Sequence, residues 1–234
     1  MNINDTTTVC INRTVNVSMK TKSISKIMKR IVDLLAGIIG MIILIPLMLI
    51  IKIANIFTKD KASIFFVQNR IGKDGKIFKM YKFRTMIIGA EEELEKLLIE
   101  NEDLRNEYEL NKKIKDDPRV TKIGKFLRKT SLDEFPQFIN ILKGEMSLVG
   151  PRPYLKREKK DIGKDYYKII EMTPGLTGLW QVSGRSNISF EERVKLDMEY
   201  YKKNSFWGDM KILLKTITAV LNKKGAVWVN NNSF

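Results

Sequence analysis

Two adjacent carboxylates, Asp133 and Glu134, are the side chains best placed to carry chemistry in this chain. They follow Arg128 and Lys129 and precede a Gly-Pro-Arg-Pro turn at 150–153. Cations can hold a phosphate group while a carboxylate attacks it or binds a metal ion, so the pattern indicates chemistry on phosphate. The 234-residue chain has no histidine, so another residue type must supply any acid, base or nucleophile.

The same carboxylates also have a purely structural explanation. Ser131 and Glu134 match an S-x-x-E capping box, in which Glu134 only satisfies a backbone N–H group. A helix that begins at Asp133, with Asp133 as its N-cap, fits the sequence better. Pro136 then lies in the first turn, where its missing N–H costs no hydrogen bond. Spacing alone favours such a helix cap over a catalytic pair.

Three weaker features each have both a functional and a purely structural explanation. Lys82 and Arg84 are two residues apart in a predicted strand, so they share a face that either meets a ligand or is solvated. The turn at 150–153 is either a stiff connection or a rigid mount that presents Arg152 to an anion. The glycine-rich segment 174–185 could approach a ligand closely, but it matches no nucleotide-binding fingerprint.

The charge and cysteine content restrict the class of protein. The 42 Lys and Arg residues against 27 Asp and Glu residues give a net charge of +15, which favours phosphate-bearing ligands such as nucleic acid, anionic lipid or nucleotide. Cys10 is the only cysteine, so an intrachain disulfide is excluded. A zinc site built on cysteine or histidine is excluded as well.

An apolar run at 31–51 predicts a membrane helix about 31 Å long. Pro46 lies inside the run, and basic residues flank both of its ends. Because basic flanks favour the cytoplasmic side, we expect a re-entrant helix that bends near Pro46 and returns, with an ordinary membrane span as the alternative. Residues 1–23 are polar and are predicted to be a disordered tail.

The rest of the chain predicts one domain of α+β class, mostly helical. Strands are expected at 63–68 and 76–83, joined by a hairpin at Asp74-Gly75. Amphipathic patterns predict helices, which we place at 90–113, 121–129, 133–143, 155–171, 189–203 and 206–222. The predicted organisation is a tail at 1–23, a membrane helix at 24–57, one folded domain at 58–226 and a tail at 227–234.

Four blocks of the sequence together resemble the bacterial sugar transferases, which are monotopic phosphoglycosyl transferases acting on polyprenol phosphate. The blocks are KRIVDLLAGIIGMIILIPL, FFVQNRIGKDGKIFKMYKFRTM, DDPRVTKIGKFLRKTSLDEFPQFINILKGEMSLVGPRP and PGLTGLWQVSGRSNISFEERVKLDMEYY. They occur in the family's order and cover the catalytic core, at about residues 26–226. The family's Ser-Pro helix break appears here as Ile45-Pro46, without the serine.

The resemblance implies a reaction and a location. A member of this family transfers a sugar-1-phosphate from a UDP-sugar to undecaprenyl phosphate and releases UMP. It works at the cytoplasmic face of the bacterial inner membrane, in the first membrane step of capsule, exopolysaccharide, O-antigen or glycoprotein glycan assembly. The lipid bilayer is a further partner, nucleic acid is not expected as one, and homo-oligomerisation and the identity of the sugar stay open.

The resemblance also implies roles for individual residues. Asp133 is the expected nucleophile that forms a phosphosugar–aspartyl intermediate, and Glu134 is the expected ligand of Mg²⁺. The remaining positions are expected to bind substrate: Lys82 and Arg128 at phosphate, Pro151, Arg152 and Pro153 at the nucleotide, and Arg84, Gln181 and Arg185 as further ligand contacts.

Two classes of non-enzyme remain as alternatives. A basic, membrane-tethered nucleic-acid-binding protein would account for the charge, and a membrane-anchored scaffold would account for the apolar helix. Neither accounts for the acidic pair, and neither predicts Mg²⁺-dependent release of UMP from a UDP-sugar.

Overall fold

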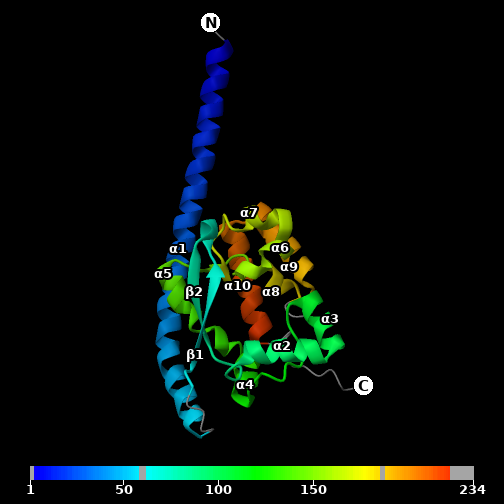
Figure 1. Ribbon diagram of the computed structural model, residues 1–234. Helices are drawn as coiled ribbons and strands as arrows, with labels where there is room; N and C mark the ends of the chain where they lie inside the picture. Colours follow the sequence, from blue (N-terminus) through cyan, green and yellow to red (C-terminus); the bar gives the residue numbers. More distant parts are fainter. Residues whose placement is uncertain (1–2, 58–61, 185–187, 222–234) are drawn as a thin grey trace, which may run out of the picture.

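The computed structural model describes residues 3–57, 62–184 and 188–221, and the side chains of residues 24–57, 62–184 and 188–219. In this part of the chain, a helical body with two small sheets lies against one long N-terminal helix (Figure 1). The expected α+β, mostly helical fold class is confirmed.

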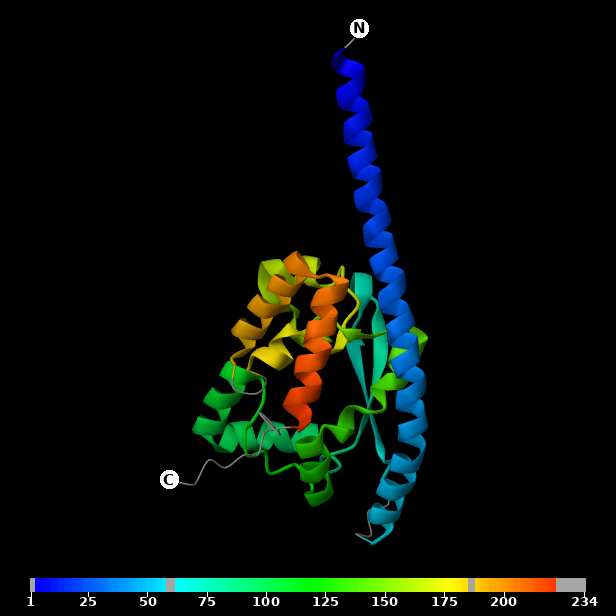
Figure 2. The same ribbon diagram turned by 180° about the vertical axis from the view of Figure 1, so that it is seen from behind.

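The N-terminal helix α1 (Ile3–Phe57) is continuous, with Pro46 inside it. Its part Ile24–Ile56 is long and apolar enough to cross a membrane. Residues 3–23, predicted as a disordered tail, instead continue the helix, and they contain no proline or glycine that would end it. The chain also does not turn back at Pro46: α1 curves along the body without reversing (Figures 1 and 2).

One face of α1 packs closely on α5 (Gln137–Lys143). A side chain at Gly37 would collide with Leu142, and one at Gly40 would collide with the ring of Phe138. The two glycines therefore allow the helices to approach closely. The opposite face of α1 is a stripe of exposed apolar side chains with helical spacing, which includes Ile24, Ile27, Ile31, Leu35, Ile38, Ile42, Ile45, Leu49, Ile53 and Ile56.

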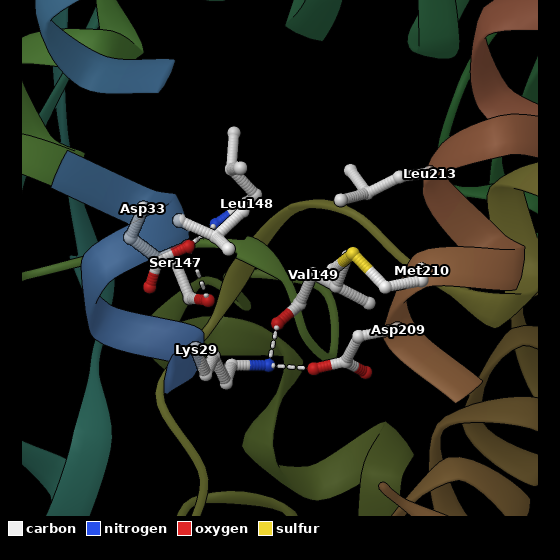
Figure 3. Close-up of a pocket in the computed structure, with 9 residues that line it drawn as sticks. Lys29, Asp33, Ser147, Leu148, Val149, Asp209, Met210 and Leu213 are labelled. Atoms are coloured by element: carbon white, nitrogen blue, oxygen red, sulfur yellow. Dashed lines mark hydrogen bonds and ion pairs between the residues drawn. The ribbon is translucent and has the colours of Figure 1, made fainter. Parts of the chain in front are cut away.

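Polar contacts also join α1 to the body, near Lys29 and Asp33 (Figure 3). We call this contact surface between α1 and the body the seam. Lys29 of α1 donates hydrogen bonds to the carbonyl of Val149 and to Asp209 of α10 (Phe206–Leu221). The carboxylate of Asp33 accepts hydrogen bonds from the hydroxyl of Ser147 and from the backbone N–H of Leu148. The cavity between these residues holds only about 10 Å³, so it is a packing seam with room for at most one water molecule.

The predicted hairpin is confirmed, with shifted boundaries. Strands β1 (Phe65–Ile71) and β2 (Ile77–Phe83) pair antiparallel. The turn between them contains Asp74 at φ 55° and Gly75 at φ 77°, both left-handed. These are the residue types that tolerate this conformation, which explains why the Asp-Gly pair located the hairpin.

The charged helix expected at 90–113 is divided into α2 (Ala90–Glu100) and α3 (Glu102–Asn111). Asn101 breaks it, because its extended backbone and its side chain cap α3 by accepting from the N–H of Leu104. The expected basic helix is confirmed as α4 (Lys122–Thr130), with Thr121 as its N-cap. A buried hydrophobic cluster joins α1, β2 and α4 through Leu44, Ile51, Phe83 and Leu127.

The segments after α5 contain a second sheet that the sequence did not predict. Strands β3 (Ser147–Val149) and β4 (Gly175–Thr177) pair in parallel. A side chain at Gly175 would stand 2.1 Å from the backbone nitrogen of Gly150, so only glycine permits this pairing. The glycine-rich segment is therefore used for close backbone packing.

Short helices complete the body. The helix expected at 155–171 is instead four short segments, named η3 (Lys156–Glu158), α6 (Lys159–Ile162), η4 (Gly163–Asp165) and α7 (Tyr166–Ile169). Next come α8 (Leu179–Ser183) and α9 (Phe190–Lys203), and then α10. The side chain of Ser189 caps α9 in a capping box with Glu192, so the predicted start of this helix is confirmed.

Candidate active site

The carboxylate pair lies on η2 (Leu132–Glu134), a single turn between α4 and α5. Ser131 ends α4 in a left-handed conformation with φ 57°, and its side chain makes no capping hydrogen bond to η2. The N-cap of α5 is Pro136, which has no side-chain cap either. The capping-box and N-cap explanations of Asp133 and Glu134 are therefore wrong, and these carboxylates are left for another role.

Cations from two other elements meet this turn. Lys82 near the end of β2 places Nζ 3.0 Å from Oε1 of Glu134. Arg128 in the last turn of α4 is held by a 2.9 Å hydrogen bond from its Nε to the hydroxyl of Thr85. The structure thus brings together Lys82, Arg128, Asp133 and Glu134, which the sequence had selected from three separate segments.

The surroundings of Asp133 make it a stronger base than an ordinary aspartate. The side chain is half-buried. Burial raises the pKa of Asp133 to about 6, and Glu134 contributes to the rise, while the positive charges of Lys82 and Arg128 oppose it. At neutral pH the carboxylate is still mostly ionised, so it combines anionic character with raised basicity, as a nucleophile requires.

The Pro-Arg-Pro turn follows β3 and is held by backbone contacts. Pro151 is fully buried, and its carbonyl accepts from the N–H of Gly175. The N–H of Arg152 donates to Asp197, a buried carboxylate of α9. The carbonyl of Pro153 accepts from Arg70 of β1. The turn is therefore a fixed mount for Arg152.

Two of the other predicted site residues donate hydrogen bonds to backbone carbonyls, and a third cannot be placed. The guanidinium of Arg84 donates to the carbonyls of Ser63 and Met86, so it braces the chain on either side of β2. Gln181 lies on α8 and donates a long hydrogen bond of 3.3 Å to the carbonyl of Leu176. Arg185 lies outside the described residues.

Several residues near the turn were not predicted from sequence. Glu158 lies 3.9 Å from Arg70 and 3.8 Å from Arg152, and Arg70 is also close enough to Glu134 to interact with its charge. Arg70 thus connects the carboxylate pair to the Pro-Arg-Pro turn. Arg70 lies on the same face of the hairpin as Lys82, which became visible only once the register of the two strands was known.

The carboxylate pair suits a metal ion that is shared with a substrate. Among the residues that the structure describes, no group of three or more His, Cys, Asp and Glu side chains could hold a metal ion by itself. Mg²⁺ usually takes one or two carboxylates and completes its shell with phosphate oxygens and water. Glu134 can provide one such carboxylate, since its side chain is 38% exposed to an incoming ligand.

Comparison with known proteins assigns the chain to a family. Residues 24–223 match the family model of the bacterial sugar transferases. The chain is 48% identical over 204 residues to an uncharacterized sugar transferase of Haemophilus influenzae, which covers 86% of this chain and 42% of that protein. It is 42% identical over 205 residues to the undecaprenyl-phosphate galactose phosphotransferase of Salmonella typhimurium, over 88% of this chain and 43% of that protein.

A third relative is similar over most of its own length. The exopolysaccharide production protein ExoY of Rhizobium meliloti is 42% identical over 198 residues, which covers 85% of this chain and 87% of that protein. The chain thus spans less than half the length of the first two relatives and most of the third. It belongs to the bacterial sugar transferase family, which confirms the resemblance drawn from its sequence blocks.

Proposed function

We propose that this protein transfers a sugar-1-phosphate from a UDP-sugar to undecaprenyl phosphate and releases UMP. The observation that carries the proposal is the carboxylate pair of η2, with Asp133 at a raised pKa beside Lys82 and Arg128. The names of relatives support the donor and acceptor classes, since they include an undecaprenyl-phosphate galactose phosphotransferase and a UDP-glucose:undecaprenyl-phosphate glucose-1-phosphate transferase. The reaction would open the membrane stage of exopolysaccharide or capsule assembly.

In the first half-reaction, a carboxylate oxygen of Asp133 attacks the phosphorus that bears the sugar. A bond forms between that oxygen and phosphorus, and the bond from phosphorus to the bridging oxygen breaks, so that UMP leaves with the bond's electron pair. Lys82 and Arg128 offset the repulsion between the anionic nucleophile and the diphosphate. The product on the protein is a phosphosugar–aspartyl ester.

In the second half-reaction, a phosphate oxygen of undecaprenyl phosphate attacks the same phosphorus. The bond to Asp133 breaks and the free carboxylate returns, while the sugar diphospholipid leaves. Because the nucleotide and the lipid react in turn, one site serves both a water-soluble donor and a membrane acceptor.

The carboxylate of Glu134 would hold Mg²⁺ together with the phosphates of the donor. When bound, the ion supplies charge neutralisation of the diphosphate. Glu134 is also paired with Lys82, and this ion pair fixes the orientation of the carboxylate before substrate arrives.

The packing of α1 supports a placement at one face of the bilayer. The apolar part Ile24–Ile56 has 33 residues and is therefore about 50 Å long, well above the roughly 30 Å of the hydrocarbon layer. Its inner face is bonded to the body through Lys29 and Asp33, so a helix perpendicular to the membrane would carry polar parts of the body into lipid. We propose that α1 lies along the cytoplasmic face with its exposed stripe in the lipid.

Release of UMP tests the proposed reaction. Purified protein is incubated with a panel of UDP-sugars, undecaprenyl phosphate and Mg²⁺, and UMP is measured. One or a few sugars should give turnover that disappears in Asp133→Asn and without Mg²⁺. Absence of UMP with every donor, or unchanged turnover in Asp133→Asn, would reject the proposal.

A further inference from the structure

A pocket of about 200 Å³ lies between α8, α9 and α10. Leu179 and Val182 of α8 and Ile212 of α10 give it apolar walls. Its volume is below the roughly 300 to 1,000 Å³ of sites that enclose a whole drug-sized ligand, so it suits one end of a larger molecule. The carboxylate pair and the two cations beside that pair do not line this pocket, so it is separate from the candidate active site.

The lining of this pocket carries more positive than negative charge. Lys203 lies at the end of α9, and Lys211 and Lys215 lie on α10. Of the described residues that line the pocket, only Glu199 is acidic, and its carboxylate already pairs with Lys203 at 2.9 Å. Lys211 and Lys215 are exposed and form no ion pair within the described part of the chain. Because these two lysines are one helical turn apart, their charges repel each other and favour an anion between them.

An exposed apolar stripe runs along α10 beside these lysines. It consists of Trp207, Leu214 and Ile217, which are 74%, 66% and 57% exposed. Trp207 lies four residues before Lys211 and Leu214 three residues after it, so both adjoin this lysine on the helix surface. Exposed apolar side chains next to lysines are typical of a helix face that contacts a membrane surface.

The stripe of α10 begins next to α1. Met210 and Leu213 of α10 line the seam to α1 (Figure 3). Ile217 follows these two residues by seven and four positions, so it lies on the same side of the helix. The stripe therefore extends the apolar surface of α1, which we place in lipid, toward the pocket. In this orientation Lys211 and Lys215 lie at the level of the lipid headgroups.

We propose that this pocket binds the headgroup of an anionic phospholipid, with the phosphate held by Lys203, Lys211 and Lys215. The headgroup supplies the negative charge that the lining lacks, and the acyl chains lie along the apolar stripe of α10. The phosphate of the acceptor lipid is a less suitable occupant, because it must reach Asp133, which does not line the pocket. The inference goes beyond the proposed reaction, since no step of that reaction uses the pocket.

Binding of dioctanoyl phosphatidylglycerol to the full-length protein in a non-ionic detergent tests the pocket without any turnover. Isothermal titration calorimetry should show affinity weakened by about 10- to 30-fold in Lys211→Gln/Lys215→Gln, because each lysine near a lipid headgroup contributes about fivefold. The matched control is Lys195→Gln/Lys202→Gln, which removes the same charge from exposed positions of α9 that do not line the pocket. It should change the affinity less than about twofold.

Dioctanoyl phosphatidylcholine, whose headgroup has no net charge, should bind the parent and both variants equally weakly. All four lysines are exposed, so thermal unfolding should show that the variants fold like the parent. The inference is overturned if Lys211→Gln/Lys215→Gln binds phosphatidylglycerol as tightly as the parent, or no more weakly than the control pair.

Two further results would overturn the choice of occupant. Displacement of the lipid by an equal concentration of inorganic phosphate would show a site for free phosphate. A loss of affinity that falls on a short-chain polyprenyl phosphate and spares phosphatidylglycerol would show a site for the acceptor. Since none of these measurements uses UMP release, a failure of the proposed reaction would be seen separately.

Discussion

At the scale of single residues, Asp133 is defined by the charges and the burial around it. The pKa of its carboxyl is about 6, because partial burial and Glu134 outweigh Lys82 and Arg128. Its neighbour Glu134 makes an ion pair with Lys82. Two adjacent carboxylates therefore have different surroundings, and this difference supports the assignment of one as nucleophile and the other as ligand of the metal ion.

The pH dependence of the first half-reaction should report Asp133. The carboxyl takes up its proton as the pH falls through about 6, and the neutral form cannot attack phosphorus. The rate of UMP release in the absence of acceptor should be level near pH 7.5 and should fall about tenfold per pH unit well below 6. Rapid-mixing assays between pH 4.5 and 8 measure this, and a flat profile down to pH 4.5 would exclude Asp133 as the titrating nucleophile.

Glu134→Gln should raise the Mg²⁺ concentration needed for half-maximal activity and lower the rate by about 100-fold or more, by analogy with the loss of one electrostatic contact to the transition state. Glutamine keeps the shape but loses the charge that would hold the cation. A Mg²⁺ titration of parent and variant measures the effect. An unchanged titration curve would remove Glu134 from the metal site.

At the scale of helices and strands, local signals in the sequence predicted the elements that they control. The Asp-Gly turn located the hairpin, and Ser189 located the start of α9. The sequence did not reveal the parallel pair β3–β4, because its strands have three residues each and are far apart in the chain. The sequence also did not reveal the break at Asn101. The apolar pattern continues across this residue, but Asn101 caps α3 and so separates it from α2.

The candidate site was predicted only in part for a related reason. Lys82, Arg128 and the carboxylate pair lie in blocks that resemble the family, so they could be chosen together. The contacts of Arg70 with Glu158 and with the Pro-Arg-Pro turn depend on how separate parts of the chain pack, which no local pattern records. Arg84 was chosen because it lies in a block that resembles the family, and its guanidinium donates hydrogen bonds to backbone carbonyls.

Asp197 on α9 holds the Pro-Arg-Pro turn through Arg152 and Tyr154. Its pKa is raised to about 7, so the folded protein keeps a proton that the unfolded chain loses near pH 4, and stability falls as the pH rises between these values. Asp197→Asn cannot titrate. Its stability relative to the parent should therefore increase from pH 4 to pH 8, by up to about 4 kcal/mol for a shift of about three pKa units.

Denaturant unfolding of the parent and the Asp197→Asn variant at several pH values measures this difference. Glu199→Gln is a suitable control, because Glu199 lies on the same helix, takes no part in its capping box and is exposed to solvent. Parallel stability curves for parent and Asp197→Asn would show that the buried carboxyl does not titrate in this range.

At the scale of the whole molecule, α1 and the body form one unit. The seam combines close packing at Gly37 and Gly40 with the polar contacts of Lys29 and Asp33 (Figure 3). From Ile24 to Ile56, the opposite face of α1 is apolar and exposed. One face of α1 thus packs on the body and the other is free to contact lipid. Such a helix can lie in the membrane surface and keep the carboxylate pair at a fixed height above that surface.

Both ends of the apolar segment should therefore face the cytoplasm. Cys10, the only cysteine, is a native probe before the segment, and Lys73→Cys in a Cys10→Ser background is a probe after it, in the exposed hairpin turn. An impermeant thiol reagent should label neither site in intact cells and both sites in inverted membrane vesicles. Labelling of Cys10 alone from outside would show that the segment spans the membrane.

The covalent intermediate is the most direct test of the proposed mechanism. The purified protein is mixed with its UDP-sugar and Mg²⁺ without any polyprenol phosphate, and the intact mass and the masses of its peptides are measured. We predict one added sugar-phosphate, located on Asp133, which disappears when undecaprenyl phosphate is added and does not form in Asp133→Asn. Turnover without any adduct, or an adduct on another residue, would contradict Asp133 as the nucleophile.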